Sequence, residues 1–150
     1  SILALLAVLT AITLLLLEIS YPPSLAQISF IVLAAILCVG KVYSPQYVLW
    51  LAPLAVIALR GKGQLASFWI WQAGEAIYHV AIWQHLASVQ GSHFGLPGTG
   101  YGLASILRIL TTVFFIGTLV QGLHRNPPPQ AQVARSRLAD FLFGSATSYP

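Results

Sequence analysis

The sequence predicts an all-α integral membrane protein with about five transmembrane helices, and three observations lead to that fold class. Of the 150 residues, 57% are hydrophobic and only 7% are charged, and the mean hydropathy is +0.82. Soluble domains usually carry about 25% charged residues, so this composition argues against a water-soluble domain. The apolar residues also fall into five runs separated by turns, and most of the basic residues stand at the ends of these runs.

The five apolar runs define the expected helices. They cover residues 2–17, 25–40, 46–59, 65–88 and 103–123. A bilayer core of about 30 Å takes about 20 helical residues, and the last two runs reach that length. The sequence contains no methionine, and the first run starts directly after residue 1. We therefore expect a truncated helix in a C-terminal piece of a longer chain. The third is short and contains Pro53, which predicts a broken helix.

The basic residues predict how the helices cross the membrane. Residues 60–63 (RGKG) and the Pro-rich, basic tail at 124–150 carry Lys and Arg, so both are expected on the cytoplasmic side of a plasma membrane. Residues 41–46 and 88–102 are each one pass away, which places them outside in a multi-pass protein. Because topology accounts for the net charge of +4, we expect membrane lipids and no nucleic acid as partners.

Gln72, Glu75 and His79 form a polar stripe within the fourth apolar run. Their spacing places them on one helix face. An ionisable group at this depth costs at least a few kcal/mol unless it faces protein or water and has a partner. The stripe is therefore either an interhelical hydrogen-bond network or the wall of a cavity for a polar ligand such as a sugar.

Arg108 lies about one and a half turns into the fifth run from the outer side. Its side chain has three expected placements: it reaches the outer headgroups, it pairs with Glu75 or another acid, or it binds a lipid phosphate. The other chemical signals are weaker. Cys38 is a single cysteine in an apolar run, and the four His are dispersed, so no disulfide and no metal site are expected.

The stretch GKVYSPQYVLWLAPL, residues 40–54, interrupts the apolar pattern with a polar turn. Pro45 disfavours a helical Ser44, so one helix is expected to end near Gly40 or Lys41 and the next to start at Pro45, with Ser44 as its N-cap. Free amides at that helix start, together with Lys41, would form an anion site. The alternative is a capped helix start with a lysine that reaches the headgroups.

This stretch resembles the NKVxSPQYxLWLxPL signature of the polyprenyl-phosphate-sugar-dependent membrane glycosyltransferases of family 87, within the GT-C group. The match covers about fifteen residues, and Gly40 stands where the family often has Asn. The family is typified by actinobacterial mannosyltransferases of the cell envelope. The resemblance implies the C-terminal part of an enzyme that moves a sugar, of mannose or arabinose type, to a lipid or glycan acceptor on the outer face.

The resemblance also assigns candidate residues. Four positions of the motif become candidates for binding the donor phosphate and the cavity rim: Lys41, Ser44, Gln46 and Tyr47. Arg108 joins them as a phosphate ligand, and Gln72, Glu75 and His79 as the cavity wall, by their expected place in the membrane. The family's general base lies near the N-terminus, so no catalytic residue is expected in this chain. The donor sugar lipid is a substrate, and no cofactor is expected.

Two other functions remain open at this point. A transporter or flippase would use the broken helix and Glu75 as a substrate or proton site. A non-catalytic membrane subunit would use the polar stripe only to hold helices together.

Overall fold

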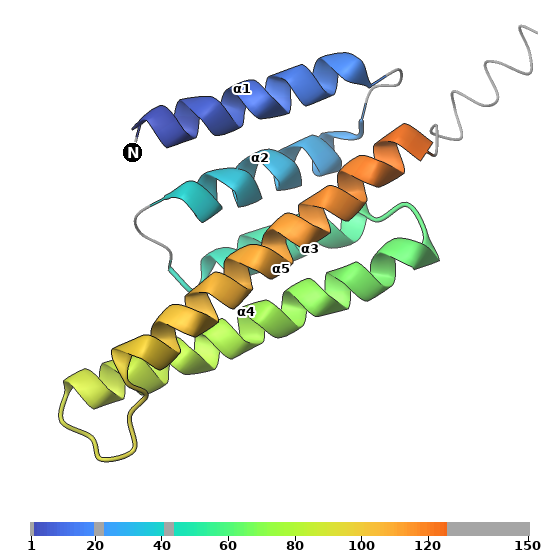
Figure 1. Ribbon diagram of the computed structural model, residues 1–150. Helices are drawn as coiled ribbons and strands as arrows, with labels where there is room; N and C mark the ends of the chain where they lie inside the picture. The colour runs from blue at the N-terminus through green and yellow to red at the C-terminus, as the bar shows by residue number, and fades with distance from the viewer. Residues whose placement is uncertain (1, 20–22, 41–43, 126–150) are drawn as a thin grey trace, which may run out of the picture.

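The computed structural model describes residues 2–19, 23–40 and 44–125, and this part of the chain consists of α-helices joined by turns (Figure 1). The five helices are α1 (Ile2–Glu18), α2 (Leu25–Val39), α3 (Tyr47–Ala58), α4 (Lys62–Val89) and α5 (Gly98–Arg125). The described residues contain no strand, which confirms the all-α prediction. Of the predicted tail at 124–150, only the first two positions are described, and they belong to α5.

Successive helices run in opposite directions (Figure 1). The main contacts are between α4 and α5 and between α2 and α3, with α2 also touching α5 and α1. As a result, the turn at 44–46 and the loop at 90–97 lie at one end of the bundle, here called the loop end. Arg60, Lys62 and His124 lie at the opposite end, here called the basic end.

Two helices are longer than the apolar runs predicted. The prediction for the fifth began at 103, but α5 begins at Gly98, because the Pro97 carbonyl accepts the Tyr101 N–H at 3.2 Å and draws the glycine-rich stretch into the helix. The fourth was predicted from 65, but α4 begins at Lys62. Its first turn closes when Gln64 N–H donates to the Gly61 carbonyl at 3.1 Å. Hydropathy missed both first turns because their residues are polar or glycine.

The start of α2 is specified by local sequence. The Ser24 side chain accepts a hydrogen bond from the Gln27 N–H, and the Gln27 side chain accepts one from the Ser24 N–H, which is a capping box. Gln27 is fully buried, and its Nε2 also donates to the Ala58 carbonyl at the end of α3, at 3.1 Å. One glutamine therefore stabilises the start of one helix and the end of the next.

An aromatic core joins α2, α4 and α5. Trp71 is fully buried and stacks on Phe115, with ring centroids 5.4 Å apart and an angle of 14° between the planes. Phe30 and Phe68 meet this pair edge-on. Residues of α3 complete the same core through Leu51, Ala55 and Ala58. Aromatic pairs of this geometry contribute beyond their buried area, so the core ties four helices together.

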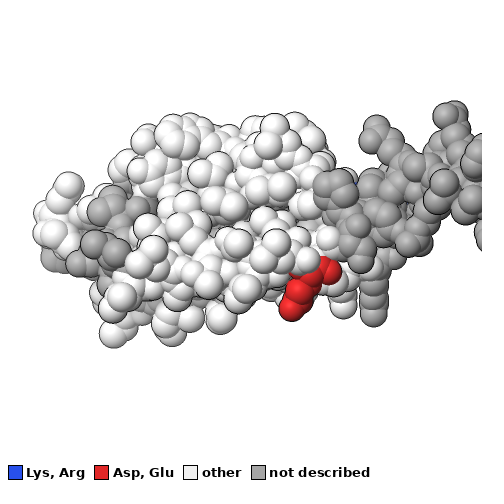
Figure 2. All heavy atoms as spheres, turned by 90° about the horizontal axis from the view of Figure 1, so that it is seen from above, with Lys and Arg blue, Asp and Glu red and all other residues white. Residues whose placement is uncertain are grey.

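The outer surface of the bundle is apolar. Large hydrophobic side chains are exposed on every helix, and Leu3, Trp50, Trp69, Val80 and Leu103 are examples. In Figure 2, one face is uncharged over its described area except for one acidic patch. Among the described helices, one is both long and apolar enough to cross a membrane, Gly98–His124. The helix α4 is as long but less apolar, with more Gln and His residues, and the first three helices are shorter.

Candidate functional site

A pocket opens between α3 and α4 at the loop end, and we call it the turn pocket. Its volume is about 370 Å³. It is lined by Ser44, Pro45, Gln46 and Leu49 on one side and by His79, Ile82, Trp83 and Leu86 of α4 on the other. The pocket therefore brings two residues of the predicted phosphate site, Ser44 and Gln46, next to His79 of the predicted cavity wall.

α3 and α4 have few direct contacts, because α3 packs mainly against α2 and α4 packs mainly against α5. Leu51, Ala55 and Ala58 of α3 nevertheless belong to the same buried core as Phe68 and Trp71 of α4. At the loop end, where α3 begins, Ser44, Pro45 and Gln46 line the turn pocket opposite Ile82, Trp83 and Leu86 of α4. The two helices leave a gap there that a ligand can enter.

The SPQY turn forms differently from the sequence expectation. Ser44 was predicted as the N-cap, but α3 begins at Tyr47 with Gln46 as its N-cap, and no cap side chain makes a hydrogen bond there. Instead, the Ser44 carbonyl accepts the Tyr47 N–H at 3.0 Å, and the Gln46 carbonyl accepts the Leu49 N–H at 3.0 Å. Pro45 sits inside this tight turn, and Gln46 is exposed beside the pocket.

The predicted polar stripe is divided between two environments. Glu75 is buried with 2% of its surface exposed, while Gln72 and His79 are half-buried. Only His79 of the three lines the turn pocket. Residues three or four positions apart on a helix lie about 60° or 40° apart around its axis, so one residue of the stripe can face a neighbouring helix while the next lies at the edge of a gap.

Glu75 and Arg108 form a buried ion pair between α4 and α5. Their Oε1 and Nη1 atoms are 4.0 Å apart, and both side chains are at least nine-tenths buried. The Arg108 guanidinium also lies over the Tyr78 ring, 5.1 Å from its centroid, a cation–π contact. Of the three expected placements of Arg108, the structure shows the pairing with Glu75. Binding of a donor phosphate by Arg108 stays a prediction, and Arg108 does not line the turn pocket.

Tyr78, Tyr101 and His85 connect this ion pair to the loop end. The Tyr78 and Tyr101 hydroxyls are 3.2 Å apart, and the His85 ring stacks on Tyr101 with centroids 4.9 Å apart and an angle of 5°. His85 Nδ1 also lies 3.1 Å from the Leu96 carbonyl oxygen. These contacts hold the 90–97 loop against α4. The half of α4 nearer the loop end is thus held in place by α5 on the side away from the turn pocket.

Three of the polar contacts that shape the bundle were missed from the sequence. Gln64 accepts the Arg60 N–H at 2.8 Å and donates from Nε2 to the Thr118 carbonyl of α5 at 3.2 Å. The Ser67 hydroxyl lies 2.9 Å from the Thr118 hydroxyl. These residues could have been found from the sequence, because each is a polar residue in or beside an apolar helix. The sequence analysis applied this criterion only to the stretch from Gln72 to His79. The pocket residues Leu49 and Leu86 gave no signal, since they look like any lipid-facing leucine.

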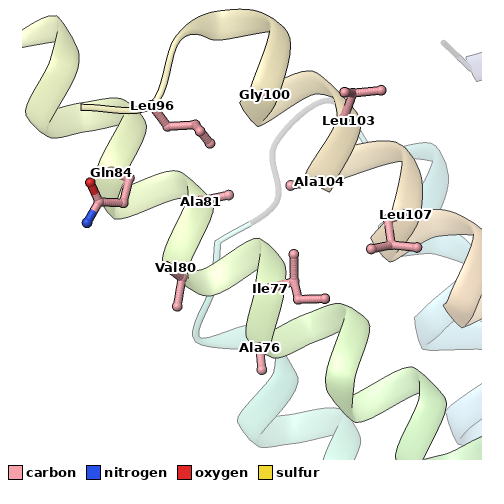
Figure 3. Close-up of a pocket in the computed structure, with 10 residues that line it drawn as sticks. All are labelled: Ala76, Ile77, Val80, Ala81, Gln84, Leu96, Gly100, Leu103, Ala104 and Leu107. Atoms are coloured by element: carbon pink, nitrogen blue, oxygen red, sulfur yellow. The ribbon is translucent and has the colours of Figure 1, made fainter. Parts of the chain in front are cut away.

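A second hollow lies along the exterior between α4 and α5 (Figure 3). Its volume is about 650 Å³, and Ile77, Val80, Leu103 and Leu107 line much of it. Leu96 closes one end, where a Cβ on Gly100 would overlap the Leu96 side chain. Its lining is almost wholly aliphatic, so it offers no groups for catalysis.

Two predicted features are not tested by this geometry. Lys41 lies outside the described residues. Among the residues that the structure describes, no group of three or more His, Cys, Asp or Glu is placed to hold a metal ion.

No protein-family model, no curated protein and no solved structure matches this chain.

Proposed function

We propose that this chain is the C-terminal, membrane-embedded part of a GT-C-type glycosyltransferase. It would take a sugar of the mannose or arabinose type from a polyprenyl phosphate and pass it to a lipid or glycan acceptor. One observation carries the proposal: the SPQY turn and His79 line the same pocket. The turn was singled out by the family resemblance and His79 by its place in the polar stripe. Two independent lines of reasoning therefore lead to one site.

The proposal places the bundle across the plasma membrane with the loop end outside. The exposed apolar side chains on every helix support this placement, because hydrocarbon is the solvent in which such a surface is stable. Arg60, Lys62 and His124 gather at the end opposite the SPQY turn, which agrees with the positive-inside rule. The turn pocket then opens near the outer headgroups, where the phosphate of a donor lipid lies.

In this proposal the turn pocket holds the donor and does not supply the base. The leaving group in transfer from a polyprenyl phosphate is a phosphate, so positive charge beside it lowers the barrier. Lys41 is the residue that the resemblance assigns to this task. Glu75 is paired with Arg108, and Glu18 lies far from the pocket at the basic end of α1, so neither is a base for this site. The base and the rest of the acceptor site are assigned to the N-terminal part of the protein.

The test is binding of a polyprenyl phosphate to the complete protein in lipid nanodiscs, followed by native mass spectrometry. Lys41→Ala is expected to lower the affinity at least tenfold, because a charge-assisted contact to phosphate is lost. Lys62→Ala is the matched control, since it removes the same charge at the basic end and should leave binding unchanged. Equal affinity of Lys41→Ala and the wild type would remove Lys41 and the SPQY turn from donor binding.

A transporter is the second candidate, and the buried Glu75–Arg108 pair is the observation that favours it. Ionisable groups inside membrane proteins often mark ion or proton pathways. A proton-coupled transporter requires Glu75 to change its protonation, so Glu75→Gln would abolish flux. In the glycosyltransferase, the same variant leaves the transfer chemistry intact in whatever fraction of the protein remains folded.

A further inference from the structure

Trp83 stands on the α4 wall of the turn pocket with most of its ring uncovered. It is 65% exposed, whereas Trp71 on the same helix is fully buried in the core. Ile82 and Leu86 flank it within the pocket, so this side of the pocket is apolar. Ser44, Gln46 and His79 bring polar groups to the same pocket. The pocket therefore offers an aromatic face together with hydrogen-bonding groups.

From this arrangement we infer that the turn pocket binds the sugar ring of the donor, with Trp83 as its stacking platform. The inference rests on the proposed function and names the sugar subsite within it. A pyranose has a face of C–H bonds and an edge of hydroxyls. The negative face of an aromatic ring attracts the polarised C–H bonds, and the hydroxyls need partners that both donate and accept. Serine, glutamine and neutral histidine side chains can do both.

The size of the pocket fits this ligand class. None of the lining residues that the structure describes is Asp, Glu, Lys or Arg, and Lys41, assigned to the phosphate of the donor, lies outside the described residues. The pocket volume of about 370 Å³ lies near the lower end of the range of about 300–1,000 Å³ found for small-molecule sites. That space suits a single polar ring and is too small to enclose a long polyprenyl chain as well.

An exposed tryptophan in a membrane protein also has a simpler use, as an anchor in the headgroup layer. A comparison with Trp69 distinguishes the anchoring role from the sugar-binding role. Trp69 lies on α4 like Trp83, is 63% exposed, and is not among the residues that line the turn pocket. An anchoring role predicts that the two tryptophans respond alike to substitution, and a sugar platform predicts that only Trp83 affects sugar binding.

The experiment compares two probes on the complete protein in nanodiscs: a polyprenyl phosphate, and the same lipid carrying a mannosyl group. The wild type is expected to bind the mannosylated lipid more tightly. Trp83→Ala is expected to reduce that preference roughly fivefold to tenfold, the size of one aromatic contact, without changing affinity for the bare lipid. Trp83→Phe keeps an aromatic face and should restore much of the preference, and Trp69→Ala should leave it intact.

The possible failures are distinguishable. Binding of neither lipid by the wild type overturns the proposed function, and the sugar subsite with it. Equal affinity of the wild type for both lipids, or a preference that survives Trp83→Ala, overturns the sugar subsite alone. A preference that Trp69→Ala lowers as much as Trp83→Ala also overturns it, because both residues would then act through the membrane. Because the Trp83 ring is mostly uncovered, its truncation is not expected to unfold the protein.

Discussion

The two sides of α4 differ in how they meet their neighbours. Toward α5, the helix is packed so closely that a Cβ on Gly74 would overlap the Thr111 side chain, and the Glu75–Arg108 pair lies beside this contact. Toward the beginning of α3, the same helix borders a pocket of about 370 Å³. The comparison shows that one helix has two kinds of neighbourhood: its α5 side is closely packed, and its α3 side borders a pocket large enough for a small ligand.

The largest expected effect comes from breaking the ion pair on the closed side. Arg108→Ala removes the cation beside Glu75, so the buried Glu75 carboxylate loses the charge that stabilises it. Removal of one partner of a buried ion pair typically lowers the free energy of unfolding by about 3–5 kcal/mol. The measurement is the unfolding midpoint in detergent micelles during a titration with sodium dodecyl sulfate. The double variant Glu75→Gln with Arg108→Met removes both charges, and it should recover most of the loss. An unchanged midpoint for Arg108→Ala would show that the pair does not stabilise the closed side.

A smaller loss is expected from opening the close contact at Gly74. Gly74→Leu forces α4 away from Thr111, and overpacking of this kind costs about 1–3 kcal/mol. Gly117→Leu is the matched control, because an added Cβ at this exposed position of α5 meets no atom within 4 Å. The same detergent titration reads both variants. Equal losses of stability in the two variants would mean that the contact between Gly74 and Thr111 has room for a larger side chain.

The smallest effect on stability is expected on the open side. Gln46 is exposed at the turn pocket, so Gln46→Ala should change the free energy of unfolding by less than about 0.5 kcal/mol. Sugar transfer by the complete protein should nevertheless fall, because the pocket loses a group that both donates and accepts hydrogen bonds. Gln121→Ala provides a control at the basic end, where the residue is also exposed. Unaltered transfer in Gln46→Ala would remove this residue from the site.

Much of the fold was predictable because the helices follow the apolar runs. The apolar runs place the ends of α2 and α3 to within one residue, since Gly40, the SPQY turn and Arg60 interrupt those runs, but the helix start expected at Pro45 is two residues too early. The start of α5 was placed five residues too late, because Gly98–Gly102 has the composition of a loop. Only the packing of the loop end, where Tyr101 meets Tyr78 and His85, explains why this stretch is helical.

The candidate site was predictable only in part. The residues Ser44, Gln46 and His79 were named from the sequence, and the structure brings them together in one pocket. The inclusion of Glu75 in the same wall rested on spacing along one helix. That spacing does not say which neighbour each residue faces, and Glu75 faces Arg108 of α5.

For the part of the chain that the structure describes, composition and hydropathy were enough to predict the all-α class and the five helices, because both properties depend on residues close together in the chain. The tertiary structure alone decided which helices separate to leave a pocket and which charges pair. Those outcomes depend on contacts between distant segments: Glu75 and Arg108 are on different helices, and so are Ser44 and Leu86. Periodicity along one segment carries no information about the partner that another segment will present.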